Sequence, residues 1–69
     1  MRLSARNQIR GKIIEIRKGI TTAHVRLEIA HEQVITSSIT NEAVEDLGLK
    51  VGDWAIAIIK ASDVMIAVA

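Results

Sequence analysis

The chain contains no cysteine, no proline, no phenylalanine and no tyrosine, and Trp54 is its one aromatic residue. The lack of cysteine excludes disulfide bonds and thiolate metal sites. His24 and His31 lie in a region typical of a strand and a turn, which is weak support for a metal site. A domain of 69 residues buries a modest share of its surface and usually needs disulfides, a metal or oligomerisation. Since 49% of the residues are apolar, we expect part of this apolar surface to face another subunit.

Long hydrophobic runs are also lacking. The run at residues 54–59 is far too short to span a bilayer. The basic residues at the start are not followed by the apolar segment of a signal peptide. We therefore expect one cytoplasmic domain over residues 1–69, with no membrane association.

Alternation of apolar and polar residues predicts strands. The clearest case is residues 20–30, in which Ala23, Val25, Leu27 and Ile29 share one face. Residues 8–17 are also strand-like, and their apolar phase switches between Ile13 and Ile14, which predicts a bulge or a sharp bend, with Gly11 nearby to permit close backbone approach. Further strands are expected at residues 33–39, 54–60 and 63–68.

One short helix is expected at residues 41–48. Thr40 can cap its start, and Glu42 in the first turn favours the helix dipole. Gly48 is expected to end it in the left-handed conformation, with Leu49 folding back on Val44. The order of elements predicts an all-β fold, a five-stranded OB-like barrel with one short helix between strands 3 and 4.

The net charge is only +1, but it is unevenly distributed. Residues 1–26 hold seven basic residues and one acidic residue, and residues 27–69 hold two basic and seven acidic ones. Either the fold interleaves these halves into a mixed surface, or the first half carries a local anion site.

Enzymatic and nucleic-acid functions have little support. Ser37, Ser38 and the histidines form no known nucleophile motif, and the four glycines are too dispersed for a phosphate loop. Single-strand binding by an OB fold depends on aromatic stacking platforms, which one tryptophan does not supply. We therefore predict neither an enzyme nor a nucleic-acid binder.

Two short segments combine the donors that an oxyanion requires. Ser4, Ala5 and Arg6 offer a hydroxyl, a backbone N–H and a guanidinium, while Lys60, Ala61 and Ser62 offer an ammonium, a backbone N–H and a second hydroxyl. Charge-assisted hydrogen bonds from such groups are strong, and N–H groups in turns form anion-binding concavities. By composition alone, each segment would equally be ordinary surface.

The segment Ser4-Ala5-Arg6-Asn7-Gln8, followed by Gly11-Lys12, resembles the signature opening of the molbindin family, whose domains also occur as TOBE modules. The resemblance extends along the chain through residues 18–23, 35–39 and 41–48. Its second specific segment is Lys60-Ala61-Ser62-Asp63-Val64-Met65-Ile66. A departure lies at His31-Glu32, which is bulkier than the glycine-rich turn associated with the family.

The resemblance implies a homohexamer, a trimer of dimers, that binds oxyanions between subunits. Ser4, Ala5 and Arg6 of one subunit would meet Lys60, Ala61 and Ser62 of a neighbour around one molybdate or tungstate. Ile20, Thr21 and Thr22 would approach a symmetry axis and form a possible second anion site. The expected function is storage and homeostasis of molybdate or tungstate. The alternative is a molybdopterin carrier or a regulatory module that acts on a partner protein.

Overall fold

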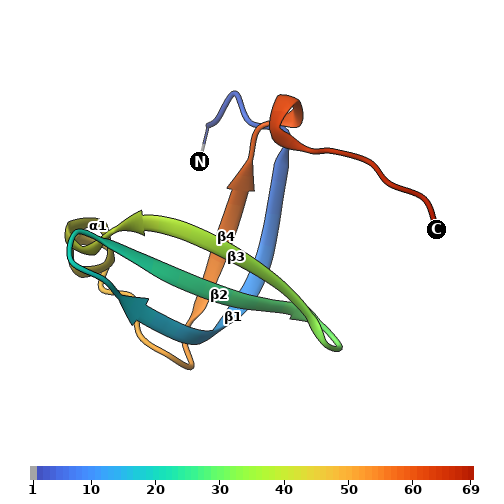
Figure 1. Cartoon of the computed structure of the whole chain (residues 1–69). Helices are drawn as coiled ribbons and strands as arrows, with labels where there is room; N and C mark the ends of the chain where they lie inside the picture. Colours follow the sequence, from blue (N-terminus) through green and yellow to red (C-terminus); the bar gives the residue numbers. More distant parts are fainter. Residues whose placement is uncertain (1) are drawn as a thin grey trace.

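The computed structural model describes residues 2–69 and shows one antiparallel four-stranded sheet in the order β3-β2-β1-β4 (Figure 1). Met1, the first residue of the expected domain, lies outside the described residues. The elements are β1 (Asn7–Lys18), β2 (Thr22–Ala30), β3 (Gln33–Thr40), α1 (Asn41–Asp46), β4 (Trp54–Ile59) and the 3-10 helix η1 (Ala61–Asp63). No helix in the described part of the chain is long and apolar enough to cross a membrane.

The alternating pattern of β2 produces the core. Ala23, Val25 and Leu27 are buried, as the sequence predicted, and Ile13 of β1 and Val44 of α1 complete the buried cluster. Their polar neighbours on β2 point to the opposite face of the sheet, because side chains alternate along a strand. The concave face of the curled sheet is therefore apolar.

The bulge expected in β1 is confirmed. The register of β1 against β2 shifts between Ile13 and Glu15, which leaves Ile14 unpaired. Gly11 lies nearby, and a Cβ at this position would come within 3.1 Å of the Glu28 carbonyl oxygen and of the Leu27 and Ile29 side chains. The glycine therefore permits the close approach of β1 to β2, and the bulge sharpens the curl of the sheet.

The expected helix caps are also confirmed. Thr40 Oγ1 accepts from the backbone N–H of Ala43 at 3.0 Å. Gly48 has φ +63°, and the N–H of Leu49 donates to the Val44 carbonyl at 3.1 Å, which closes the end of the helix. The helix itself is shorter than predicted, because residues 47 and 48 belong to its cap.

The fifth strand expected at residues 63–68 is not present in the structure. Residues 64–69 form no strand, and Figure 1 shows this C-terminal segment leaving η1 and extending away from the sheet. A strand requires a hydrogen-bonding neighbour, and η1 turns the chain away from the free edge of β4. Residues 64–69 are all apolar, but no segment of the described chain pairs with them.

The expected five-stranded barrel is not complete in the described chain for the same reason. β3 and β4 are the two edges of the sheet and do not pair with each other in the described chain. The described residues form an all-β, curled and open four-stranded sheet with one short α-helix that follows β3 and precedes β4 in the chain.

Candidate functional site

The two predicted donor segments lie at the same end of the β1–β4 ladder. The last registered pair is Asn7 with Ile59, and Asn7 Nδ2 donates to the Ile59 carbonyl at 3.2 Å. Residues 4–6 directly precede this pair and residues 60–62 directly follow it, so both reach the end of the sheet where the N-terminal segment and η1 meet in Figure 1. The family resemblance implies that the two halves of one site come from neighbouring subunits, and in each chain both halves lie at the same end of the sheet.

The donor groups are presented to solvent. Ser4, Arg6, Lys60 and Ser62 are exposed, whereas Ala5 is buried and anchors the N-terminal segment. In η1, Asp63 N–H donates to the Lys60 carbonyl at 2.9 Å and Val64 N–H donates to the Ala61 carbonyl at 3.3 Å. These bonds leave the first N–H groups of the turn free, as at the start of any helix.

Arg6 and Lys60 form no ion pair within residues 2–69, although Asp63 lies in the same turn as Ser62. The two ion pairs of the described chain are Lys18 with Glu45 at 3.6 Å and Arg26 with Glu15 at 3.4 Å. Arg6 and Lys60 belong to neither pair. Elsewhere the basic first half of the sequence and the acidic second half lie side by side, since Lys12 stands opposite Glu28 in the sheet. An uncompensated pair of cations beside hydroxyl and N–H donors attracts a small anion.

A metal cation has no comparable site. The described residues contain no group of three or more His, Asp or Glu side chains that could hold a metal ion. The donor set at residues 4–6 and 60–62 consists of hydrogen-bond donors and cations, which favours an oxyanion over a metal cation.

The second predicted segment, Ile20, Thr21 and Thr22, lies in and beside the β1–β2 turn, far along the sheet from the first segments and close to α1 (Figure 1). The Ile20 side chain is 99% exposed. Beside the turn is a hollow of about 250 Å³, lined by Arg17, Lys18, Gly19, Thr22 and His24.

Sequence reasoning missed Arg17 and His24 at this hollow. They are partners in the β1–β2 register, and both are exposed on the same face of the sheet. The signal was available, because the register of a short hairpin determines which residues stand opposite each other.

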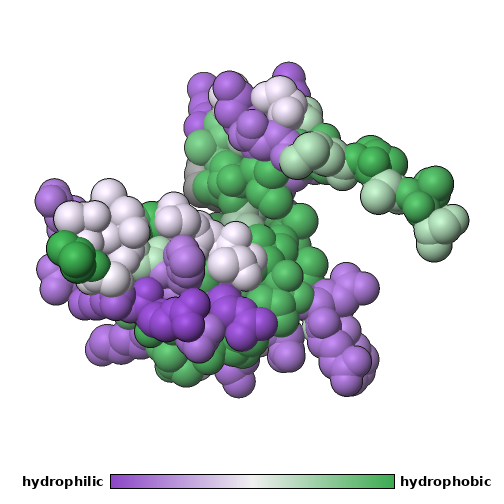
Figure 2. Space-filling view, viewed as in Figure 1, coloured by the Kyte–Doolittle hydropathy of each residue, from purple (hydrophilic) through white to green (hydrophobic). Residues whose placement is uncertain are grey.

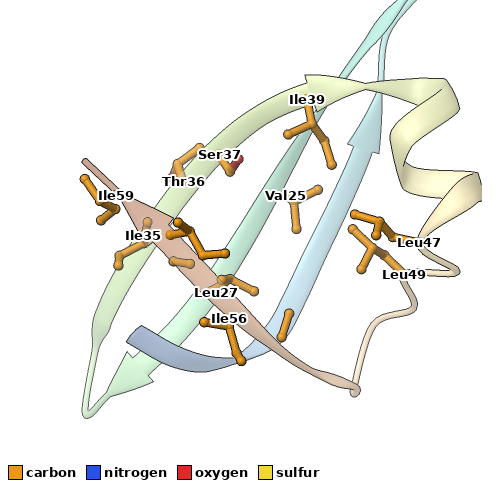
Figure 3. A pocket seen from close by; sticks show the side chains of 13 residues that line it. Val25, Leu27, Ile35, Thr36, Ser37, Ile39, Leu47, Leu49, Ile56 and Ile59 are labelled. Carbon is orange, nitrogen blue, oxygen red and sulfur yellow. The ribbon is translucent and has the colours of Figure 1, made fainter. Parts of the chain in front are cut away.

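An apolar groove also escaped the sequence prediction. It encloses about 420 Å³ between the edge strands β3 and β4 and the end of α1 (Figure 3). Among the side chains that line it are Val25, Leu27, Ile35, Ile39, Leu49 and Ile59. In a closed barrel these side chains would be covered by a fifth strand.

The C-terminal segment also exposes large apolar side chains. The exposed fractions are 93% for Met65, 86% for Ile66 and 92% for Val68. Figure 2 shows this segment as an apolar arm that stands clear of the body. One chain thus leaves both an apolar groove and an apolar strand-like segment uncovered.

Comparison with known proteins connects this architecture to one family. The TOBE domain model matches residues 3–66. "Molybdenum-pterin-binding protein 1" of Clostridium pasteurianum is 52% identical over 66 residues, which cover 96% of this chain and 97% of that protein.

Two solved structures show the same fold. The apo form of MopII from Clostridium pasteurianum superposes with a TM-score of 0.88 at 48% identity, covering 97% of this chain and 100% of that one. The cytoplasmic molybdate-binding protein ModG, crystallised with molybdate bound, gives a TM-score of 0.89 at 48% identity, covering 94% of this chain and 46% of the ModG chain. Fold, sequence and family model agree, and the chain belongs to the molbindin (Mop) family of TOBE-domain proteins.

Proposed function

We propose that this protein binds molybdate or tungstate between copies of itself and stores the anion in the cytoplasm. The observation that carries the proposal is the placement of residues 4–6 and residues 60–62 at one end of the β1–β4 ladder. This placement puts two cations, two hydroxyls and several backbone N–H groups at one end of each subunit, where residues 4–6 of one copy can face residues 60–62 of another. The names of the relatives, which refer to molybdenum-pterin or molybdate binding, support the same ligand class.

The chemistry of the site suits a tetrahedral dianion. Arg6 and Lys60 supply charge-assisted hydrogen bonds, and Ser4 and Ser62 supply neutral ones. Molybdate and sulfate share charge and shape, but molybdate is larger. A site with fixed donors discriminates by size, because a smaller anion leaves some of these hydrogen bonds unmade.

A second copy of the chain accounts for the two uncovered apolar surfaces. Residues 64–69 of one copy supply the strand that the groove of another copy lacks. This exchange buries Met65, Ile66 and Val68, which are almost fully exposed in one chain. Because the exchanged segment begins directly after η1, the same contact fixes Lys60, Ala61 and Ser62 at the interface. Anion binding and assembly are then linked, and the family resemblance favours a hexamer built as a trimer of dimers.

The β1–β2 turn forms the second anion site of the proposal. Ile20, Thr21 and Thr22 contribute backbone N–H groups, and Arg17 and His24 line the adjoining hollow. A symmetry axis at this turn would bring several copies of these donors around one anion.

Equilibrium dialysis against micromolar molybdate tests the binding function. We expect retention of molybdate in competition with a large excess of sulfate, with tungstate competing effectively. Retention no greater than that of sulfate would contradict the proposal. Native mass spectrometry of the same sample reports the subunit number and the mass of bound anion together, and a monomer that binds molybdate would contradict the interface site.

A pterin carrier is the alternative function, and the name of the Clostridium relative, a molybdenum-pterin-binding protein, favours it. A pterin ring requires a stacking surface, and Trp54 is the one aromatic side chain of the sequence. The guanidinium of Arg10 lies over the Trp54 ring, 5.0 Å from its centroid, and so occupies one of its faces. Pterin fluorescence that copurifies with the native protein would support the carrier over the storage function.

A further inference from the structure

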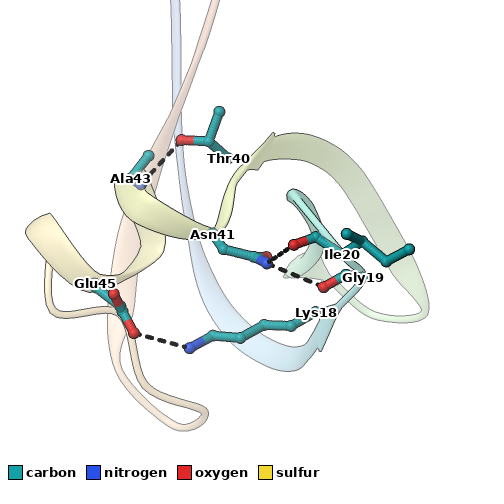
Figure 4. Close-up of polar contacts among 7 residues, drawn as sticks. All are labelled: Lys18, Gly19, Ile20, Thr40, Asn41, Ala43 and Glu45. Carbon is teal, nitrogen blue, oxygen red and sulfur yellow. Dashed lines mark hydrogen bonds and ion pairs between the residues drawn. The ribbon is translucent and has the colours of Figure 1, made fainter.

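Three consecutive carbonyl groups of the β1–β2 turn point toward one residue, Asn41. Its side-chain Nδ2 donates to the carbonyls of Gly19 at 3.0 Å and of Ile20 at 3.2 Å, and its backbone N–H donates to the carbonyl of Thr21 at 2.9 Å. Figure 4 shows the Asn41 side chain reaching from the start of α1 to the turn. The residue that begins the helix thus determines the orientation of three peptide groups in another part of the chain.

The orientation of these carbonyls determines that of the N–H groups. In a trans peptide, the C=O of one residue and the N–H of the next point in opposite directions, and the peptides of residues 19–22 are trans. With the carbonyls of Gly19, Ile20 and Thr21 turned toward Asn41, the following N–H groups point away from α1. Within residues 2–69, neither the Ile20 nor the Thr21 N–H donates to another backbone or side-chain group.

The arrangement carries an energetic cost that stability alone does not explain. Asn41 Oδ1 is buried and has no hydrogen-bond partner among the described residues. Such an atom loses its hydration without compensation, which destabilises the folded state. Unsatisfied buried polar atoms are rare in native proteins and call for a reason. The reason here is that the same amide holds the turn with its N–H groups directed outward.

We propose that Asn41 is a positioning residue for the second anion site. It orients the N–H groups of Ile20, Thr21 and Thr22 into a cluster of donors for an oxyanion, beside the hollow lined by Arg17, Lys18 and His24. The ion pair of Lys18 with Glu45, 3.6 Å apart, further links β1 to α1. This inference rests on the proposed function, because it concerns the second of the two proposed sites.

The test compares two substitutions at neighbouring positions. Asn41→Asp keeps the size of the side chain but replaces the donating amide by a carboxylate that faces two carbonyls. The control, Thr40→Ala, removes the cap of the same helix and leaves the contacts to the turn unchanged. Calorimetric titration of the full-length protein with molybdate separates the two classes of site. In Asn41→Asp we expect second-class affinity to fall about tenfold or more, the equivalent of one lost charge-assisted contact, and first-class affinity to stay the same.

A structural role alone predicts a different result. If Asn41 served only to stabilise α1, Thr40→Ala would weaken the second class equally, and that outcome would overturn the inference. Retention of both classes in Asn41→Asp would also overturn it. If the wild-type protein showed a single class of binding, the proposed second site itself would be wrong, whatever the variants did.

Amide NMR provides an independent readout of the same turn. In the wild-type protein, molybdate should shift the N–H resonances of Ile20 and Thr21. The same shifts should appear in the Thr40→Ala variant. In Asn41→Asp these shifts should be lost at anion concentrations that still saturate the first class. A second binding class that leaves these resonances unmoved in the wild type would place the anion elsewhere and refute the role of Asn41.

Discussion

Asn7 and Ile59 form the last registered pair of the β1–β4 ladder, and the Asn7 side chain donates to the Ile59 carbonyl at 3.2 Å. The two proposed halves of the anion site leave the sheet at this pair. Arg6 precedes Asn7 by one residue, and Lys60 follows Ile59 by one residue. Arg6 and Lys60 therefore leave the same end of the sheet, and each subunit presents both halves of the proposed interface site there.

Arg6→Ala and Lys60→Ala should each weaken molybdate binding. A hydrogen bond to a charged group contributes about 1.5–3 kcal/mol, so each loss should raise Kd roughly tenfold to a hundredfold. Both side chains are exposed, so the fold and assembly should persist. Calorimetric titration and sedimentation velocity measure the two properties.

Lys50→Ala is the matched control for these substitutions. Lys50 is an exposed cation in the connection between α1 and β4, far from the donor segments. The Lys50→Ala variant should bind molybdate with the affinity of the parent protein. The site assignment is wrong if both Arg6→Ala and Lys60→Ala retain the parent affinity, and the effect is one of net charge if all three substitutions weaken binding alike.

Ile66→Glu should disrupt assembly and anion binding together. Ile66 is 86% exposed in one chain but becomes buried if residues 64–69 complete the sheet of a second copy. A carboxylate there would require desolvation without a partner, which opposes association. Analytical ultracentrifugation should show a shift toward smaller species at low protein concentration, with a parallel loss of molybdate retention.

Val51→Glu separates this effect from a general response to added charge. Val51 is 62% exposed and lies in the turn before β4, outside both the C-terminal segment and the groove. We expect its variant to keep the parent assembly. An unchanged assembly in Ile66→Glu would instead show that residues 64–69 do not form the contact between copies.

The local elements of the fold were predictable from the sequence because their causes are local. The phase switch at Ile13 and Ile14 indicated the bulge, and the spacing of Thr40 and Gly48 indicated the two ends of α1. Each of these features depends on side chains within a few residues of one another.

The failures have a non-local cause. The apolar run that follows Asp63 is typical of a buried strand, but a strand forms only where a neighbour supplies hydrogen bonds, and the described chain supplies none there. The position of Asn41 against the β1–β2 turn was equally invisible, because it joins residues more than twenty positions apart. The first donor segments could be named from their chemistry and from the family resemblance, whereas their common location required the register of β1 with β4.

Gly11→Ala should destabilise the protein without altering the anion donors. The added Cβ would lie 3.1 Å from the Glu28 carbonyl oxygen, which belongs to the backbone and has little freedom to move. Overpacking of this kind typically costs about 1–3 kcal/mol. Urea denaturation at matched protein concentration measures the loss, and a change below about 0.5 kcal/mol would show that β1 and β2 separate more easily than their contacts suggest.

Glu32→Gly should stabilise the β2–β3 hairpin. Glu32 follows His31 in the two-residue connection between Ala30 and Gln33, and its φ of 55° lies in the left-handed region. That conformation costs a residue with a Cβ about 1–2 kcal/mol and costs glycine little. Part of the gain is offset because glycine also increases the freedom of the unfolded chain. We expect a net increase of about 0.5–1 kcal/mol in the free energy of unfolding, measured by urea denaturation.

Glu32→Ala removes the same charge but keeps the Cβ, so it should give no such increase. If it stabilises the protein equally, relief of charge rather than relief of backbone strain is the cause.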